Sequence, residues 1–348
     1  MRCSVAIRSA TALALALVLG CSSSDETTSE TVDAAATSSE PVIPTELVTI
    51  EGGRYLMGSP AGEGFGEEQP QHIVTQPTFQ LEKYEVTHEQ YVAFLQAQGN
   101  ECVVGTDSRP CMDCNDPDVL ISCDDNYAIR DRCQAVSNGA RDKTCANHPA
   151  VEVTWHGCHA YCAHIGRRLP SEAEWERAAN GPGGPDGTDW RRYPWGSNCP
   201  GLFNFGPDLT SCEEEAWTAE ESRMNCVQTE CFDGFKATAP VDSFPAGVTP
   251  EGLYNMSGNV WEWVEDDWHT GFEAAPTDGS AWLGNAEDAF GHNGEPEPEN
   301  GKGSHSDEDE WHSRVVKGGG WYDPGFFSRS AIRVNGHSDD DIGCRCAL

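Results

Sequence analysis

Four cysteines form two close pairs that lie more than 180 residues apart in the chain. Cys158 and Cys162 stand four residues apart in a segment with helical spacing, so both project from one face of a helix. Cys344 and Cys346 stand two residues apart in a strand-like segment, again on one face. Two such pairs can form neighbouring cross-links, and we expect Cys162–Cys346 and Cys158–Cys344. In the chain-entropy model, closing a loop of this length stabilises a fold by about 4–5 kcal/mol, less any strain.

The remaining cysteines indicate further disulfides. The chain has 16 cysteines, and an even number is left once Cys3 and Cys21 are set aside. Disulfides are the default for such a chain in an oxidising, exported environment. Cys111 and Cys114 also have the C-x-x-C spacing that can begin a zinc site, although export favours disulfides. Ten cysteines form two groups where insertions would lie: Cys102, Cys111, Cys114, Cys123, Cys133 and Cys145, then Cys199, Cys212, Cys226 and Cys231.

The N-terminal sequence predicts export. Residues 1–20 place Arg2 and Arg8 before an apolar run that ends at a small residue, which is the pattern of a signal peptide. The run is shorter than the roughly 20 apolar residues that a membrane span needs. Its end, VLGC, resembles a lipoprotein signal, in which Cys21 becomes the lipidated N-terminus; plain secretion after a nearby cleavage is the alternative. Ser22 stands where an aspartate would retain a lipoprotein in the inner membrane, so the outer membrane is favoured. The lipid anchor would be the protein's only contact with that membrane.

Composition separates a tether from one folded domain. Residues 21–43 are rich in Ser, Thr, Ala and acids and have almost nothing to bury, so we interpret them as a flexible tether. Residues 44–348 contain no further linker-like break and predict a single domain, which we expect to be monomeric. The formal net charge of −35 argues against nucleic acid as a partner, because phosphate binding needs clustered Lys and Arg. Residues 285–310 are interpreted as a solvated acidic loop.

The hydrophobic and turn patterns predict an α+β fold with little regular structure. Residues 47–59 alternate and break at Gly52 and Gly53, which indicates a hairpin. Residues 84–99 begin with a capping box of Thr87 and Gln90, and we expect a helix there. Two more helices are expected in 153–166 and in 169–181. Ser171 and Glu174 mark the start of the last helix and Gly181 its end. Residues 317–330, KGGGWYDPGFFSRS, favour a strand, a tight turn and a second strand.

The order of several short motifs resembles one known family. GGRYLMGS, YEVTHEQYVAFL, RRLPSEAEWERAA, LYNMSGNVWEWVEDDW, VVKGGGWYD and IGCRCA follow one another as in the formylglycine-generating enzyme, or sulfatase-modifying factor, domain. The resemblance covers residues 45–348 and implies one domain with a modified C-type-lectin-like fold, stabilised by calcium and disulfides. It places Cys-rich insertions at about 99–147 and 206–231 and an acidic insertion at about 270–312. Cys162–Cys346 also matches a disulfide of the family.

The resemblance implies two calcium sites. The first would use the Asn204 side chain, the Phe205 carbonyl, the Asp233 side chain and the Phe235 carbonyl. The second would use the Asn255 side chain, the Gly258 and Val260 carbonyls and the Glu262 side chain. The second segment, NMSGNVWE, suits a hard cation by itself, because it presents side-chain and carbonyl oxygens on a glycine-bent loop. Turn capping beside a tryptophan cluster is the alternative role for Asn255 and Glu262.

The resemblance also implies that the family's copper chemistry is missing. Oxidising members carry a serine and two copper-binding cysteines in the segment after Gly-Gly. The corresponding positions here are Gly320, Asp323 and Ser328. Copper(I) prefers thiolate or thioether donors, and neither replacement can form a mixed disulfide, so copper is not expected. His156 and His159 lie three apart on the second expected helix and could share a face, but surface histidines without a metal are the favoured interpretation.

Two functions remain open at this point. The first is an accessory module at the cell envelope that binds a peptide, a sulfatase-like protein or a glycan in an aromatic groove. That groove would use Trp321, Tyr322, Asp323, Phe326 and Arg333, whereas core packing is the favoured role of Trp261 and Trp263. The second is a metal-dependent oxidoreductase of the same family, either a formylglycine-generating oxidase or a non-haem iron enzyme, acting on a protein or thiol through Asp323 and nearby histidines.

Overall fold

The computed structural model describes residues 45–115, 119–124, 126–130, 145–183, 190–196, 223–224, 233, 235, 237–284, 314–336 and 341–348. The chain divides into units Met1–Ser38 and Ser39–Leu348, and all described residues belong to the second. Its elements are β1 (Leu47–Ile50), β2 (Gly53–Met57), β3 (His72–Gln76), β4 (Phe79–Glu82), α1 (His88–Gln98), β5 (Glu101–Val104), β6 (Asp107–Pro110), β7 (Ile121–Ser122), β8 (Ala128–Ile129), α3 (Trp155–His164), α4 (Glu172–Asn180), β9 (Trp261–Asp267), β10 (Arg314–Lys317), β11 (Val334–Gly336) and β12 (Ile342–Gly343).

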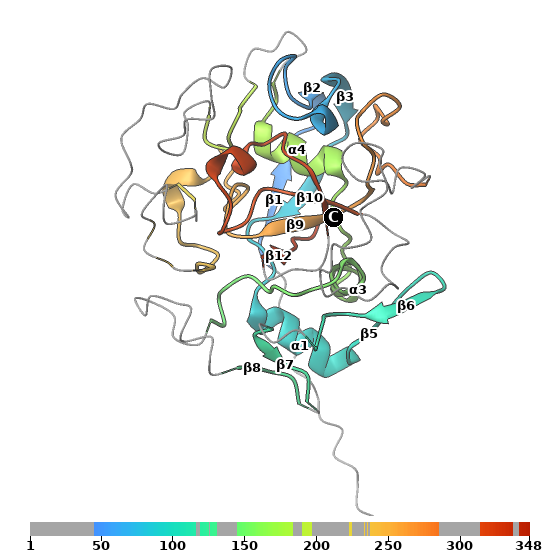
Figure 1. The fold of residues 1–348 in the computed structure, drawn as a ribbon, viewed down its shortest axis with the longest axis vertical. Coiled ribbons are helices and arrows are strands. Elements are labelled where there is room, and N and C mark those ends of the chain that lie inside the picture. Colours follow the sequence, from blue (N-terminus) through green and yellow to red (C-terminus); the bar gives the residue numbers. More distant parts are fainter. Residues whose placement is uncertain are drawn as a thin grey trace, which may run out of the picture. The chain divides into compact units, whose positions relative to one another are not determined.

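A mixed four-stranded sheet forms the centre of the domain, in the order β11-β10-β9-β12 (Figure 1). β10 pairs antiparallel with β9 and β11, whereas β12 runs parallel to β9. Alternation along β9 puts Trp261 and Trp263 on one face and Val264 on the other. The two tryptophans pack in a core cluster with residues of α1 and α3, and Val264 packs with Trp175 of α4. Helices therefore cover both faces of the sheet, and the α+β expectation is supported.

The three helices begin where the sequence indicates. Thr87 caps α1 and Ser171 caps α4, and each forms the reciprocal capping box with Gln90 or Glu174. α4 ends at Gly181, whose φ of +81° is favourable for glycine. These termini are set by local hydrogen bonds, which is why they could be predicted. No helix in the described part of the chain is both long and apolar enough to cross a membrane.

The hairpin expected at Gly52 and Gly53 is wrong. β1 pairs with β4, and β2 pairs with β3, in one continuous antiparallel register. The chain therefore runs straight through the two glycines and reverses within residues 58–71. A Cβ at Gly52 would lie 2.6 Å from the backbone nitrogen of Thr78, so this glycine allows close strand approach instead of a turn.

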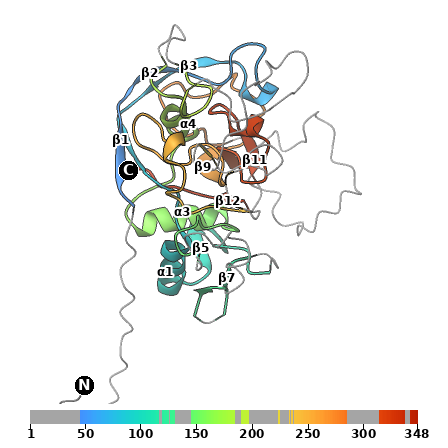
Figure 2. The ribbon, with the colours of Figure 1, turned by 90° about the vertical axis from the view of Figure 1, so that its left-hand side faces the viewer.

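Both long-range disulfides are confirmed. Cys158–Cys344 and Cys162–Cys346 tie α3 to the segment that follows β12, with Cα atoms 6.2 Å and 5.6 Å apart, although Cys344 and Cys346 do not lie in the strand expected for them. α1 and α3 pack together, and the β5–β6 hairpin lies beside α3 (Figure 2). Gly157 permits this contact, because a Cβ there would lie 1.9 Å from the carbonyl oxygen of Cys111.

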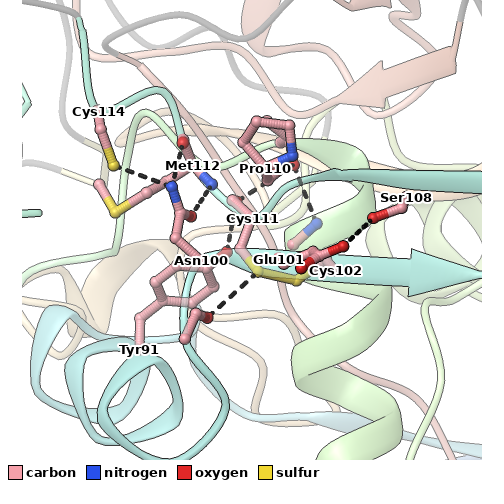
Figure 3. Close-up of a disulfide and its surroundings, with 12 residues drawn as sticks. Tyr91, Asn100, Glu101, Cys102, Ser108, Pro110, Cys111, Met112 and Cys114 are labelled. Atoms are coloured by element: carbon pink, nitrogen blue, oxygen red, sulfur yellow. Dashed lines mark hydrogen bonds between the residues drawn. A yellow bond between two sulfur atoms is a disulfide. The ribbon is translucent and has the colours of Figure 1, made fainter.

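In the described part of the Cys-rich segment, the two short disulfides Cys102–Cys111 and Cys114–Cys123 cross-link the chain, and Cys145 is also disulfide-bonded. Figure 3 shows the first of them at the end of the β5–β6 hairpin. The zinc alternative for Cys111 and Cys114 is therefore excluded, since each sulfur is committed to a different disulfide. The acidic residues 285–310 and the cysteines of the second group lie outside the described residues.

Candidate functional site

Residues 317–330, which the resemblance assigns to the active site, form a strand, a loop and a 3₁₀ turn. β10 ends at Lys317, and Gly325–Ser328 forms the 3₁₀ turn, so the second strand expected before residue 330 is wrong. Pro324 fixes an extended entry to the turn, and its carbonyl accepts a hydrogen bond from the Phe327 N–H. Gly319 has φ of +79°, and a Cβ there would lie 2.6 Å from the Phe327 carbonyl oxygen. The glycines thus let the loop fold back on the turn.

Asp323 holds this loop in place through its side chain. Its Oδ2 accepts hydrogen bonds from the indole N–H of Trp261 at 2.7 Å and from the Gly320 N–H at 2.9 Å. A Cβ on Gly320 would lie 2.1 Å from Oδ2 of Asp341, so a serine here would require Asp341 to move. Two of the three altered family positions are therefore adapted to each other and to neighbouring acids.

Ser328 lies inside the protein. It is fully buried, and its carbonyl accepts a hydrogen bond from the Ser257 hydroxyl. Within the described residues its own Oγ has no hydrogen-bond partner. All cysteines in the described ranges, from Cys102 to Cys346, are in disulfides. No thiolate therefore stands at this site in the described part of the chain.

Five aromatic side chains on the loop or beside it are exposed or partly exposed, and together we call them the exposed aromatic surface: Phe65, Trp321, Tyr322, Phe326 and Phe327. Phe65 is 42% exposed and Tyr322 69% exposed. The Phe65 and Phe326 rings meet edge to face with centroids 5.0 Å apart, and Trp321 and Tyr322 meet at 5.5 Å. Phe65 was missed in the sequence, because it lies in a glycine- and glutamate-rich loop with no recognisable motif.

A buried ion pair joins the two loops that carry this aromatic surface. Arg329 donates two hydrogen bonds of 2.6 Å to the carboxylate of Glu68 and a third of 3.0 Å to the Phe326 carbonyl. Arg329 and Glu68 are 5% and 0% exposed, so the bidentate pair is shielded from water. The guanidinium also lies 4.1 Å from the Phe326 ring centroid. Arg329 therefore fixes Phe326 against the loop of Phe65.

Arg333 does not belong to the exposed surface. It is 2% exposed, and its guanidinium pairs with the carboxylate of Glu172 at 2.8 and 2.9 Å. The groove assignment of Arg333 is thus wrong, because its charge is neutralised in the interior. Trp261 and Trp263 are also buried, as expected for core packing.

The second calcium segment presents oxygen atoms in a buried polar cluster. Asn255 is 3% exposed, and its Oδ1 has no hydrogen-bond partner among the described residues. Glu262 receives hydrogen bonds from Arg345 at both oxygens and from the Trp175 indole at Oε2, which leaves Oε1 with one bond. An orphaned amide oxygen and a carboxylate oxygen with a remaining lone pair fit a hard cation.

Glu85 is a second buried carboxyl group in this cluster. Its carboxylate accepts hydrogen bonds from the side-chain amides of Asn255 at 2.8 Å and Asn259 at 2.9 Å. Burial raises the pKa of Glu85 to about 8, Arg345 partly offsets this, and the charge of Glu262 adds to it. A cation bound in this cluster would favour the ionised form of Glu85 and so lower this pKa.

The other proposed metal ligands are placed only in part. Asp233 is buried and its Oδ1 accepts the Phe235 N–H at 2.7 Å, whereas Asn204 and Phe205 lie outside the described residues. His156 contacts Asp107 at 3.0 Å, and His159 lies 3.8 Å from Glu265. Burial lowers the pKa of both histidines. In the ranges that the structure covers, no three His, Cys, Asp or Glu side chains converge as a metal site.

Comparisons with known proteins place the chain in context. A formylglycine-generating enzyme of Thermomonospora curvata is 32% identical over 64% of this chain and 73% of its own length. An inactive C-alpha-formylglycine-generating enzyme 2 of Bos taurus is 28% identical over 71% of this chain and 79% of that protein. The serine/threonine-protein kinase Pkn1 of Chlamydia trachomatis is 34% identical over 65% of this chain. This chain spans only 28% of that relative's length.

The fold and the whole-chain pattern agree with these relatives. The solved structure of PvdO from Pseudomonas aeruginosa superposes with a TM-score of 0.55 and 28% identity, covering 87% of this chain and 94% of that one. The family model of the sulfatase-modifying factor enzyme 1-like domain matches residues 33–348. The chain therefore belongs to the sulfatase-modifying factor enzyme 1-like domain family.

Proposed function

We propose that this chain is a family member without cysteine-to-formylglycine oxidase activity, and that it binds a peptide segment through the exposed aromatic surface. The observation that carries the proposal is the carboxylate of Asp323, which accepts hydrogen bonds from Trp261 and Gly320 at the position of a copper-binding cysteine. A carboxylate used in this way holds a loop in shape. It does not supply the soft sulfur donor that copper(I) prefers.

The absence of thiols at the site supports the same conclusion. Ser328, at the second cysteine position, is fully buried, and all cysteines of the described segments are oxidised. A serine hydroxyl and a carboxylate cannot form a mixed disulfide with a substrate cysteine. The relative from Bos taurus is named an inactive C-alpha-formylglycine-generating enzyme, and this name is consistent with loss of the activity in some family members.

The aromatic surface supports binding. Tyr322 and Phe65 are large aromatic side chains that folding leaves exposed, and exposed aromatic side chains are typical of recognition surfaces. The Arg329–Glu68 pair holds Phe326 beside Phe65, so the surface is preorganised. The net charge of −35 favours peptides with basic residues over acidic ones.

The remaining parts of the proposal concern calcium and location. Two calcium ions would be held at the Asp233 and Asn255 segments, where the orphaned Asn255 oxygen supports the second site. Calcium there would neutralise buried carboxylate charge and stiffen the loop that leads into β9. The N-terminal sequence supports a lipoprotein exported to the cell envelope, with Cys21 lipidated, and we propose that it acts as a monomer.

A peptide-binding experiment tests this function. A fluorescent peptide with the sulfatase-type pattern Cys-x-Pro-x-Arg, and the same peptide with alanine for cysteine, are titrated into the full chain and followed by anisotropy. We expect similar affinities of this surface for both peptides, because neither Asp323 nor Ser328 carries a sulfur that could exchange with the peptide cysteine. Tyr322→Ala and Phe326→Ala should each weaken binding by about tenfold, as for aromatic contacts at an interface centre.

Leu283→Ala is the matched control, since Leu283 is 57% exposed but lies in a different loop. It should leave the affinity unchanged. Equal binding by wild type, Tyr322→Ala and Phe326→Ala would contradict the assignment of the surface. Covalent attachment of the cysteine peptide within residues 317–330, located by peptide mapping, would contradict the absence of thiol chemistry at Asp323.

A further inference from the structure

One disulfide differs from the others in its exposure. Seven of the described cysteines are buried, among them Cys102 and Cys111 at 2% and 0% exposed. Cys114 and Cys123 are both partly exposed and lie at the edge of the core. In the described part of the chain, the Cys114–Cys123 bond is therefore the disulfide that an external thiol can reach without opening the core.

The Cys102–Cys111 bond provides an internal comparison. Both disulfides join cysteines nine residues apart in the same Cys-rich segment, so they close loops of equal length. The entropy of loop closure should therefore favour neither bond over the other. A difference in reactivity between them must come from exposure and from the groups around each sulfur.

A hydrogen-bond donor is aimed at one sulfur of the exposed disulfide. Asn100 follows α1, and its Nδ2 lies 2.9 Å from Sγ of Cys114 (Figure 3). The same amide bonds the Met112 carbonyl at 3.2 Å and accepts the Met112 N–H at 3.0 Å through Oδ1. These bonds to the backbone fix the orientation of the amide. The N–H would stabilise negative charge on Cys114 when that sulfur becomes a thiolate.

We propose that Cys114–Cys123 is a thiol–disulfide exchange site that oxidises dithiols of a neutral or basic polypeptide. A substrate thiolate attacks Sγ of Cys123, a new S–S bond joins substrate and Cys123, and Cys114 leaves as the thiolate that Asn100 stabilises. The second substrate thiolate then attacks the substrate sulfur of that mixed disulfide. Cys123 leaves as a thiolate, the substrate is oxidised to its disulfide, and Cys114 and Cys123 are left as a reduced pair.

The charge around the site determines the kind of thiol. Asp113 precedes Cys114, and the exposed Asp124 follows Cys123. Their carboxylates accept hydrogen bonds from neutral groups, from the Asn115 N–H for Asp113 and from the Ser122 hydroxyl for Asp124. These two carboxylates therefore repel an anionic thiol and attract a cationic one. Added salt should weaken both effects, because it screens interactions between exposed charges. This site lies in the Cys-rich segment and does not depend on the aromatic surface.

Exchange with small thiols on the folded full chain tests the proposal. Cysteamine and 3-mercaptopropionate serve as the cationic and anionic probes. The reaction is stopped by alkylation, and peptide mapping by mass spectrometry locates each adduct. We expect the first adduct on Cys123 with Cys114 alkylated, while Cys102–Cys111 stays closed. Cysteamine should react faster than 3-mercaptopropionate, and the ratio should shrink as salt is added.

Asn100→Asp removes the donor to Cys114 but keeps the acceptor for the Met112 N–H. It should slow opening of the disulfide by at least about tenfold, since a hydrogen bond to a charged group is lost. Asn126→Asp introduces the same charge in the same segment without a contact to Cys114, and its rate should stay within about twofold of the wild type. Thermal unfolding of both variants checks that they are folded.

Three results would overturn the proposal. The first is an adduct on Cys114 with Cys123 released. The second is opening of both short disulfides at one rate, or only at denaturant concentrations that unfold the protein. The third is an unchanged rate in a folded Asn100→Asp variant. If that variant does not fold, the comparison of the two probes on the wild type decides, and equal rates for both would contradict the proposal.

Discussion

The indole N–H of Trp261 donates a 2.7 Å hydrogen bond to Oδ2 of Asp323, which ties the first residue of β9 to the loop after β10. The Gly320 N–H reaches the same oxygen. One carboxylate oxygen thus orders the loop at the position that the family resemblance assigns to a copper-binding cysteine. The contact connects the central sheet to the exposed aromatic surface, because Trp321 and Tyr322 lie between Gly320 and Asp323.

The role of Asp323 predicts different outcomes for two substitutions. Asp323→Asn keeps an oxygen that can accept both hydrogen bonds, so its stability should be close to that of the wild type. Asp323→Ala leaves the Trp261 and Gly320 donors unpaired and should lower the free energy of unfolding by about 1–3 kcal/mol. Urea unfolding measures both. Equal losses in the two variants would show that charge, and not the accepted hydrogen bonds, gives Asp323 its role.

Lys317 predicts a large loss of stability. It is fully buried, and its ammonium donates a 2.9 Å hydrogen bond to Glu176, whose pKa is raised by burial. Lys317→Met leaves that carboxylate without its cation and should destabilise the fold by about 3–5 kcal/mol. Lys83→Met breaks the exposed pair with Glu46 and should cause no measurable change. Similar midpoints for both variants in denaturant would contradict the assignment of Lys317 as an essential buried cation.

Asp266 predicts a pH dependence of stability. Burial raises its pKa from 3.8 to about 7, and the charge of Glu172 contributes. The folded protein therefore binds this proton more tightly than the unfolded chain does. The contribution of Asp266 to stability is largest below its unfolded pKa and is lost as the pH rises through the folded value.

Asp266→Asn removes this titration. The free energy of unfolding of the wild type, minus that of the variant, should fall steadily from pH 5 to pH 7 and then level off. Denaturation at four pH values between 5 and 8 measures it. A difference that is constant over this range would show that Asp266 is already ionised in the folded protein.

Calcium should stabilise the chain if the Asn255 segment binds it. Removing calcium with a chelator should lower the melting temperature, and adding it back should restore the value, because a ligand that binds only the folded state stabilises it. Asn255→Ala should reduce this response, whereas Asn115→Ala, at an exposed asparagine, should not. Identical melting curves with calcium and with chelator would contradict the calcium proposal.

The parts of the fold that could be predicted depend on local patterns. Thr87 with Gln90 and Ser171 with Glu174 satisfy helix N-termini within four residues, so the sequence is sufficient to identify them. The two long-range disulfides were also predictable, because each cysteine pair must face one way on its own element. At Gly52 the same reasoning failed, since a glycine can allow close strand packing as well as a turn.

The arrangement of the site could be predicted only in part. The family motifs identified Asp323 and Ser328, but no local pattern indicated that Arg329 pairs with Glu68, 261 positions earlier in the chain. Arg333 was expected in the groove, yet its side chain pairs with Glu172 in the interior. Whether such a side chain is buried depends on contacts between segments that are distant in the chain. The pattern of a single sequence does not reveal these contacts.

The central claim is that oxygen donors at Asp323 and Ser328 cannot replace the copper-binding thiols. The most direct test incubates the full chain with copper(I), oxygen and a Cys-x-Pro-x-Arg peptide and follows the peptide mass. We predict unchanged peptide with the wild type and with Asp323→Asn. Conversion of the peptide cysteine to an aldehyde by the wild-type chain, abolished in Asp323→Asn, would contradict the account.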